Sequence, residues 1–236
     1  MIPVMAEIAP AGVTITNRAE ITWFDTADGL VKKLYSNTSE IVVAEQLALT
    51  LTNDNLRHAS PGQQVSLPHR ITNTGNIESS YELQLVLNTD ADMRQLDKLA
   101  VYIDLNGNGA ASAGEPEITA SACSDGSTDK VCFIIPNAEP GDIVEFVVKG
   151  ATSVMHQVGD EYKLDVVAAP IGHPEKAVQN TDTVDLISGA NLSIMKSTSP
   201  SCGTPVAPSD AVTVTLRYSN SGDDKPVAKD FSIDGE

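Results

Sequence analysis

The chain has 236 residues, of which 32 are acidic and 15 basic, so its formal net charge is −17. This excess of carboxylates argues against a nucleic-acid-binding protein, because phosphate binding needs clustered Lys and Arg. Hydrophobic residues make up 41% of the chain and aromatic residues 4%. That composition is enough for a packed core made mainly of aliphatic side chains. No apolar run reaches the roughly 18 residues of a transmembrane helix, so we expect no membrane span.

Short segments of alternating apolar and polar residues follow one another along almost the whole chain. Turn signals such as Pro61-Gly62, Thr74-Gly75-Asn76 and Pro140-Gly141 separate them, and only Ala91–Leu99 is typical of a short helical turn. This pattern predicts an all-β fold of antiparallel β-sandwiches. The predicted strands are Val13–Thr16, Ala19–Trp23, Glu40–Val43, Leu47–Thr52, Val65–Thr72, Tyr81–Leu87, Leu99–Ile103, Cys132–Ile135, Ile143–Val148, Tyr162–Val167, Thr183–Ile187, Leu192–Met195 and Val212–Tyr218.

The N-terminal segment allows two interpretations. Val4-Met5-Ala6 has the small-x-small character of a signal-peptide cleavage site, so residues 1–6 are interpreted as a remnant of an export signal. The alternative is an arbitrary start of the sequence. Trp23, in ITWFD, is expected to be a core or staple residue rather than a platform for a sugar ring.

A twelve-residue segment from Asp104 to Glu115 (DLNGNGAASAGE) matches the EF-hand calcium loop. Oxygen-bearing side chains fall at positions 1, 3 and 5, Gly109 at position 6 allows a sharp bend, and Glu115 at position 12 offers both carboxylate oxygens. Position 7 would contribute a backbone carbonyl and position 9 a hydroxyl, directly or through water. The predicted ligands for Ca²⁺ are Asp104, Asn106, Asn108, Ala110, Ser112 and Glu115.

The flanks of this loop indicate its role. Leu99–Ile103 is a predicted strand, so we expect a structural clip between strands and not the helix–loop–helix of a calcium sensor. Only Asp104 and Glu115 carry charge, which predicts weak binding near the 10⁻⁴–10⁻³ M range of extracellular modules. The alternative is an Asn-Gly-rich turn that binds no ion.

The chain has three cysteines. Cys123 and Cys132 flank the turn-like stretch SDGSTDKV, while Cys202 stands apart. The close pair is predicted to form a disulfide, which indicates an oxidising compartment and hence export. The alternative is two reduced thiols.

An internal repeat is visible in the sequence. Residues 60–76 (SPGQQVSLPHRITNTGN) overlay residues 207–223 (APSDAVTVTLRYSNSGD) at an offset of 147 positions, with Asn73 on Asn220. Self-similarity at a fixed period is typical of tandem modules. We therefore predict an N-terminal strand-rich unit (1–45), a complete sandwich (46–188) and the truncated start of a second sandwich repeat (189–236), so that the chain is expected to be part of a longer protein.

The phrases GVTITNRAEITW, SNTSEIVV, SPGQQVSLPHRITNTGN, VYIDLNGNGAASAGEP and KSTSPSCGTPVAPSDAVTVTLRYSNSGD together cover much of the chain. They resemble the conserved Ig-like repeat domains of large bacterial surface and secreted proteins, one family of which is a domain of unknown function. Related folds occur in serine-aspartate-repeat adhesins. The resemblance implies an extracellular, array-forming β-sandwich with no enzymatic role.

Three functions are compatible with these features. The first is a calcium-stabilised spacer module of an adhesin-like surface protein, with neighbouring repeat modules as its partners and a host or matrix surface as a further one. The second is a carbohydrate- or protein-binding module that uses Trp23, Phe24 and Tyr35. The third is an accessory domain of a secreted hydrolase. We expect no catalytic centre, because no known catalytic motif occurs, and we expect the four scattered histidines to be exposed or half-buried.

Overall fold

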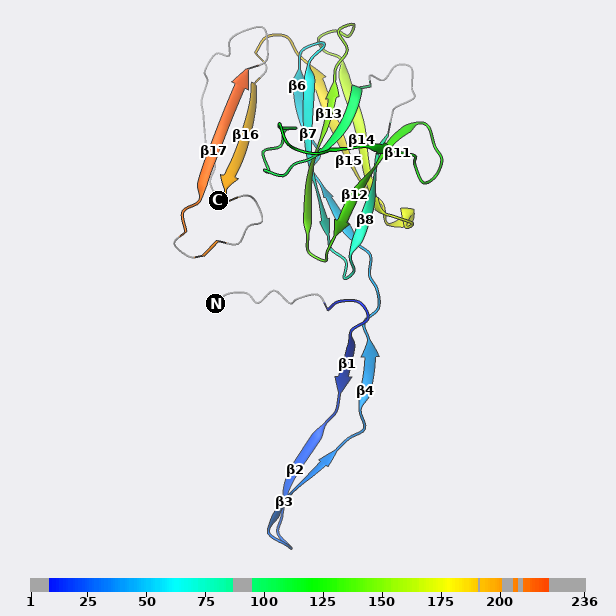
Figure 1. Ribbon diagram of the computed structural model, residues 1–236, viewed down its shortest axis with the longest axis vertical. Coiled ribbons are helices and arrows are strands. Elements are labelled where there is room, and N and C mark those ends of the chain that lie inside the picture. The colour runs from blue at the N-terminus through cyan, green and yellow to red at the C-terminus, as the bar shows by residue number, and fades with distance from the viewer. Residues whose placement is uncertain (1–8, 87–94, 191, 201–205, 208–209, 221–236) are drawn as a thin grey trace.

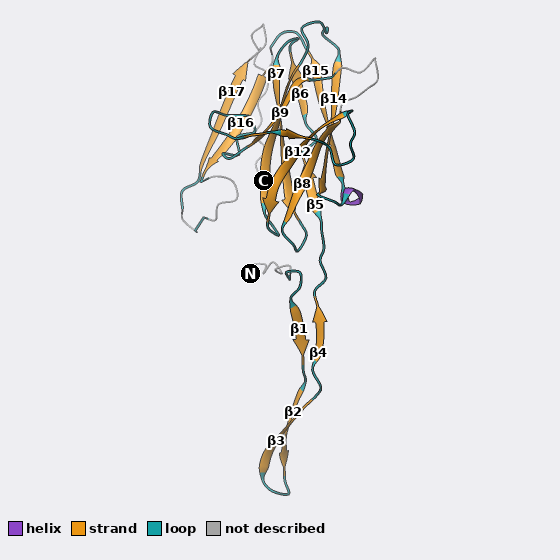
Figure 2. Cartoon of the chain, turned by 45° about the vertical axis from the view of Figure 1, so that its right-hand side comes forward, coloured by secondary structure: helices purple, strands orange, loops and turns teal. Residues whose placement is uncertain are grey.

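The computed structural model describes residues 9–86, 95–190, 192–200, 206–207 and 210–220 (Figure 1). Three parts stand out: a β-sandwich, a long two-stranded extension at its N-terminal side, and a separate two-stranded ribbon near the C-terminus (Figures 1 and 2). The fold is all-β, as predicted, with one short 3₁₀ helix, Pro174–Lys176, in the described residues.

The sandwich consists of two sheets. The first has the strand order β10-β9-β13-β7-β5 and the second the order β11-β12-β8-β14-β15-β6. The strands of the first sheet are β5 (Leu49–Thr52), β7 (Gln64–Asn73), β9 (Asp97–Ile103), β10 (Glu117–Ile118) and β13 (Ile143–Ala151). The strands of the second are β6 (Leu56–Ala59), β8 (Ser79–Val86), β11 (Ala120–Ser121), β12 (Lys130–Ala138), β14 (Glu161–Pro170) and β15 (Val178–Leu186).

The core lies between these two sheets and follows from the alternation in the sequence. Along β7, every second side chain from Val65 to Asn73 is buried, as expected for a strand with one face on a core. Aliphatic side chains such as Leu67 and Leu83 are fully buried, and Phe133, Phe146 and Tyr162 fill the larger spaces between them. Burial of each such side chain contributes about 1.5–3 kcal/mol.

Strand prediction failed in several places. The strands β3 (Leu30–Tyr35), β6, β10 and β11 were not predicted, and β6 pairs with β15 in parallel, whereas an antiparallel fold was expected. The predicted helical turn Ala91–Leu99 lies partly outside the described residues, but Asp97–Leu99 opens β9. Pairing of β9 with β13 outweighs the local helical pattern, because ladder hydrogen bonds come from tertiary context that propensity does not include.

The N-terminal unit is a two-stranded extension, here called the arm (residues 13–43). Strand β1 (Thr14–Asn17) pairs with β4 (Ser39–Val42), and β2 (Glu20–Asp25) pairs with β3 at the tip. The arm projects away from one end of the sandwich (Figure 1). Its base is fixed by Asn76, whose side chain accepts a hydrogen bond from the Gln46 amide at 2.7 Å and donates one to the Ala44 carbonyl at 2.9 Å.

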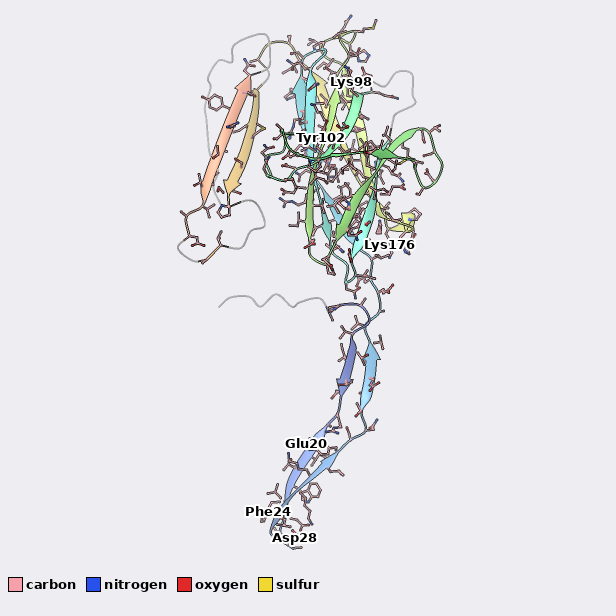
Figure 3. The ribbon with its side chains drawn as sticks, viewed as in Figure 1. Glu20, Phe24, Asp28, Lys98, Tyr102 and Lys176 are labelled. Carbon is pink, nitrogen blue, oxygen red and sulfur yellow. A yellow bond between two sulfur atoms is a disulfide. The ribbon has the colours of Figure 1, made fainter. Side chains whose placement is uncertain are left out.

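Many apolar side chains of the arm are exposed to solvent. Trp23, predicted to lie in the core, is 42% exposed, and Phe24 next to it is 60% exposed. The expectation for Trp23 is therefore wrong for this chain, because the two-stranded arm has no second layer that would cover either face. Figure 3 shows Phe24 at the far end of the arm, between Glu20 and Asp28.

The C-terminal ribbon consists of β16 (Leu192–Ser199) and β17 (Thr213–Asn220), paired antiparallel. Its pairing repeats that of β5 with β7. Leu49 lies opposite Asn73 in the sandwich, and Leu192 lies opposite Asn220 in the ribbon. The overlay of Asn73 on Asn220 found in the sequence thus places two residues at equivalent positions of two strand pairs.

A polar cluster joins the two sheets inside the sandwich. His69 on β7 contacts Asp182 on β15, with 2.8 Å between Nε2 and Oδ2, and both side chains are fully buried. Asp182 Oδ1 also accepts hydrogen bonds from the backbone and side-chain nitrogens of Asn55, both at 2.9 Å. His69 was expected to be exposed or half-buried. It is buried because this carboxylate and the Phe146 ring, stacked 5.3 Å away, enclose it.

Candidate calcium loop

The predicted calcium loop connects β9 to β10. Its ends are held together by a hydrogen bond from the Ile103 amide to the Pro116 carbonyl at 3.0 Å and by pairing of Tyr102 with Glu117. The Tyr102 hydroxyl donates to Glu117 Oε2 at 2.9 Å, and this bond raises the pKa of the phenol. Both flanking elements are strands, so the loop has the setting expected of a clip and not that of a helix–loop–helix.

Asp104 at the first position organises the start of the loop. Its Oδ2 accepts a hydrogen bond from the Gly109 amide at 2.7 Å, and its Oδ1 accepts one from the Asn108 amide at 3.2 Å. Gly109 has a φ of +72°, a left-handed conformation that glycine adopts at no steric cost. These bonds fold the chain back on Asp104, which is 8% exposed.

Hydrogen bonds connect the remaining predicted ligand positions to one another. Asn106 Nδ2 donates to Glu115 Oε1 at 2.7 Å, and Asn108 Nδ2 donates to Ser112 Oγ at 2.8 Å. The Ser112 amide donates to Glu115 Oε2 at 2.6 Å.

The Ser112 hydroxyl reaches the Ala110 carbonyl at 3.2 Å. With this bond, the loop brings together all six predicted positions, 104, 106, 108, 110, 112 and 115. A hard cation requires several oxygens around one point, whereas the Oδ1 atoms of Asn106 and Asn108 here accept hydrogen bonds from the Asn108 and Ala110 amides. Calcium binding by these six positions stays a prediction.

The chemistry of this donor set is mostly neutral. No group of three or more His, Cys, Asp or Glu side chains that could hold a metal occurs in the part of the chain that the structure describes. The loop supplies only two such side chains, Asp104 and Glu115, so an ion there would depend on amide, hydroxyl and carbonyl oxygens as well. Calcium accepts such ligands, whereas zinc prefers nitrogen and sulfur.

A groove of about 410 Å³ lies beside the loop. It is lined by loop residues, including Asp104 and Asn108, and by Arg70, Glu145 and Lys196. The guanidinium of Arg70 is paired with the carboxylate of Glu145.

The predicted disulfide is present between Cys123 and Cys132. It ties the loop after β11 to β12, and the Ser124 amide and hydroxyl in this loop both donate to Glu82, at 3.1 Å each. Cys202 lies outside the described residues. The bond fits the oxidising compartment inferred from the sequence.

We expect removal of this disulfide, by Cys123→Ser with Cys132→Ser, to lower the free energy of unfolding by about 2.7 kcal/mol, because a short closed loop no longer restricts the unfolded chain. Urea denaturation of the oxidised protein and the double variant measures the difference. Equal denaturation midpoints would contradict the expectation.

The buried cluster of Asn55, His69 and Asp182 is the part that sequence analysis missed. Its members are separated by up to 127 positions, so no local pattern connects them. The only sequence signal is the histidine itself, at a position of β7 where the alternation calls for an inward-facing side chain.

Comparison with known proteins identifies no family for this chain. No family model matches the chain, and no curated protein matches it. Among solved structures, the Bacillus cereus major pilin subunit BcpA is similar over 83% of this chain and 66% of its own, with 10% identity and a TM-score of 0.37. AggA, the major subunit of Escherichia coli aggregative adherence fimbriae type I, covers 62% of this chain and 98% of its own, with 8% identity and a TM-score of 0.28.

A third similar structure is the PapD-like domain 7 of human CEP192, with 12% identity and a TM-score of 0.29 over 59% of this chain and 84% of its own. At these TM-scores none of the three decides a function. Within the described residues, no helix has the length and hydrophobicity needed to cross a membrane.

Proposed function

We propose that this chain is a structural spacer segment of an exported, adhesin-like repeat protein of the bacterial surface, built from Ig-like modules and stabilised by calcium in the loop 104–115. The observation that carries the proposal is the repeated register, in which Leu49 opposite Asn73 recurs as Leu192 opposite Asn220. A strand pair that opens one sandwich and recurs after its end is typical of tandem modules, whose partners are the neighbouring repeats.

Calcium fits this role as a clip. Bound in the loop, it would fix the β9–β10 connection at the edge of the first sheet and take the place of the Asn106 amide as the partner of Glu115. The disulfide Cys123–Cys132 supports export to an oxidising environment. Calcium-binding modules outside the cell typically have dissociation constants of about 10⁻⁴–10⁻³ M.

We expect about 10 mM calcium to raise the free energy of unfolding by about 1.4–2.7 kcal/mol, because this concentration is about ten to a hundred times a Kd of about 10⁻³–10⁻⁴ M. Thermal unfolding with and without calcium measures this. The variant Asp104→Asn with Glu115→Gln keeps the size of both side chains but removes their charge, and we expect it to lose the response.

The matched control is Asp129→Asn with Glu139→Gln, which neutralises two exposed carboxylates outside the loop. It is expected to respond to calcium as the wild type does. If wild type and control show no shift in melting temperature, or if the loop variant shifts as much as they do, the calcium proposal fails.

A second function is favoured by one observation, the exposed aromatic side chains of the β2–β3 hairpin. Trp23, Phe24 and Tyr35 are all more than 40% exposed, with Phe24 and Tyr35 on one face of the hairpin and Trp23 on the other. Exposed aromatic side chains of this kind can bind a sugar or a protein. A glycan array probed with wild type and Trp23→Ala tests this candidate, which fails if no glycan is retained by the wild type in preference to the variant.

A further inference from the structure

The arm repeats the last strand pair of the sandwich. In β14 and β15, Glu161, Tyr162, Lys163 and Leu164 lie opposite Asp185, Val184, Thr183 and Asp182. In the arm, Thr14, Ile15, Thr16 and Asn17 lie opposite Val42, Ile41, Glu40 and Ser39. Residues 37–51 (NTSEIVVAEQLALTL) overlay residues 180–194 (NTDTVDLISGANLSI) at a single offset of 143 positions, so β4 followed by β5 corresponds to β15 followed by β16.

This correspondence relates one face of the arm to the buried face of β14 and β15. Ile15 and Ile41 occupy the positions of Tyr162 and Val184, each of which is 1% exposed in the sandwich. In the arm the same positions are 52% and 68% exposed. We call the side chains of Val13, Ile15, Ile41 and Val43 the arm face.

The ribbon has a matching surface. Its strands correspond to β5 and β7, and the buried positions of those two strands are occupied in the ribbon by apolar side chains that are 50–85% exposed. We call this set the ribbon face: Leu192, Ile194, Val212, Val214, Leu216 and Tyr218.

These two faces are counterparts of surfaces that pack on each other. Inside the sandwich, β15 lies against β5 across the core. Leu216 of the ribbon corresponds to His69 at the offset of 147, and Ser39 of the arm corresponds to Asp182 at the offset of 143. Both charged partners are replaced together, so a contact between the faces would leave no buried carboxylate or imidazole unpaired.

We propose that the arm face of one copy packs on the ribbon face of a second copy, so that the chain associates head to tail. The proposal rests on the repeat pattern of the proposed spacer function but not on calcium. An isolated two-stranded sheet is marginally stable in water, and contiguous exposed apolar side chains mark interaction surfaces. Because the two faces differ, the contact is heterologous, and each added copy leaves a free arm and a free ribbon at the ends.

The test uses the full chain in sedimentation velocity. We expect the weight-average mass of the wild type to exceed 24.9 kDa and to rise with concentration. The arm variant, Ile15→Ser with Ile41→Ser, and the ribbon variant, Val214→Ser with Leu216→Ser, are each expected to be monomeric. A mixture of the two variants is expected to form dimers and nothing larger, because one intact arm and one intact ribbon remain for each pair.

The matched control is Thr14→Ser with Val42→Ser, a neighbouring cross-strand pair on the opposite face of the arm, which is expected to associate like the wild type. Unchanged thermal unfolding of each variant at low concentration shows that the sandwich is intact. A monomeric wild type, a ribbon variant that still dimerises through arm–arm contacts, or a mixture that stays monomeric would overturn the interface. Calcium-dependent stabilisation would be unaffected by any of these results, so the two proposals fail separately.

Discussion

Asp182→Ala is expected to lower the free energy of unfolding by about 3–5 kcal/mol, the range seen when one partner of a buried pair is removed. Asp182 accepts hydrogen bonds from His69 and from two nitrogens of Asn55, and its side chain is fully buried. The variant would leave these donors without a partner in the space between the two sheets, where each unsatisfied group costs about 1–3 kcal/mol.

Urea denaturation followed by circular dichroism measures the effect. Asp185→Ala is the matched control, because Asp185 lies three residues further along β15 with a side chain that is 37% exposed and only a 3.7 Å contact to His58. It is expected to cost less than about 1 kcal/mol. If Asp182→Ala and Asp185→Ala lowered the free energy of unfolding equally, the buried cluster would stabilise the fold no more than an exposed ion pair does.

Phe133→Ala is expected to cost about 3–5 kcal/mol, because removal of a buried ring loses its transfer free energy and leaves a cavity. Phe133 is 2% exposed and lies opposite Leu83 in the second sheet. Phe24→Ala removes the same ring from the arm, where it is 60% exposed, and is expected to change the stability of the sandwich by less than about 0.5 kcal/mol.

The comparison of these two phenylalanines is made by urea denaturation at low protein concentration. A loss for Phe24→Ala as large as that for Phe133→Ala would mean that the arm belongs to the same cooperative core as the sandwich. That result would contradict the division of the molecule into a sandwich and an exposed arm.

The predictable parts of the fold are those that local patterns define. Alternation along Val65–Thr72 and Tyr162–Val167 predicted β7 and β14, because burial on one face imposes a period of two. The short strand β6 and the parallel pairing of β6 with β15 depend on contacts between residues more than 120 positions apart. Nothing within a short window of sequence reports such contacts.

The position of the loop 104–115 between two strands was predictable for the same reason, while calcium binding there stays a prediction. Its six ligand positions lie within twelve residues, and the spacing alone determines which side chains can turn inward. The role of the arm was not predictable from hydrophobicity, since Trp23 and Phe24 have the pattern of core residues. The relation of the arm to a buried strand pair is seen only when the pairing of β1 with β4 is compared with that of β14 with β15.

The most direct test of the calcium-stabilised spacer is an NMR titration of the isotope-labelled chain with calcium, followed through the backbone amides. The amides of Asn108, Gly109, Ala110 and Ser112 donate to the side chains of the loop. We predict that their shifts change saturably with a Kd of about 10⁻⁴–10⁻³ M, and that Asp104→Asn with Glu115→Gln abolishes the change. Amide shifts that stay constant in the loop up to about 10 mM calcium, ten times the weakest affinity expected, would contradict the account.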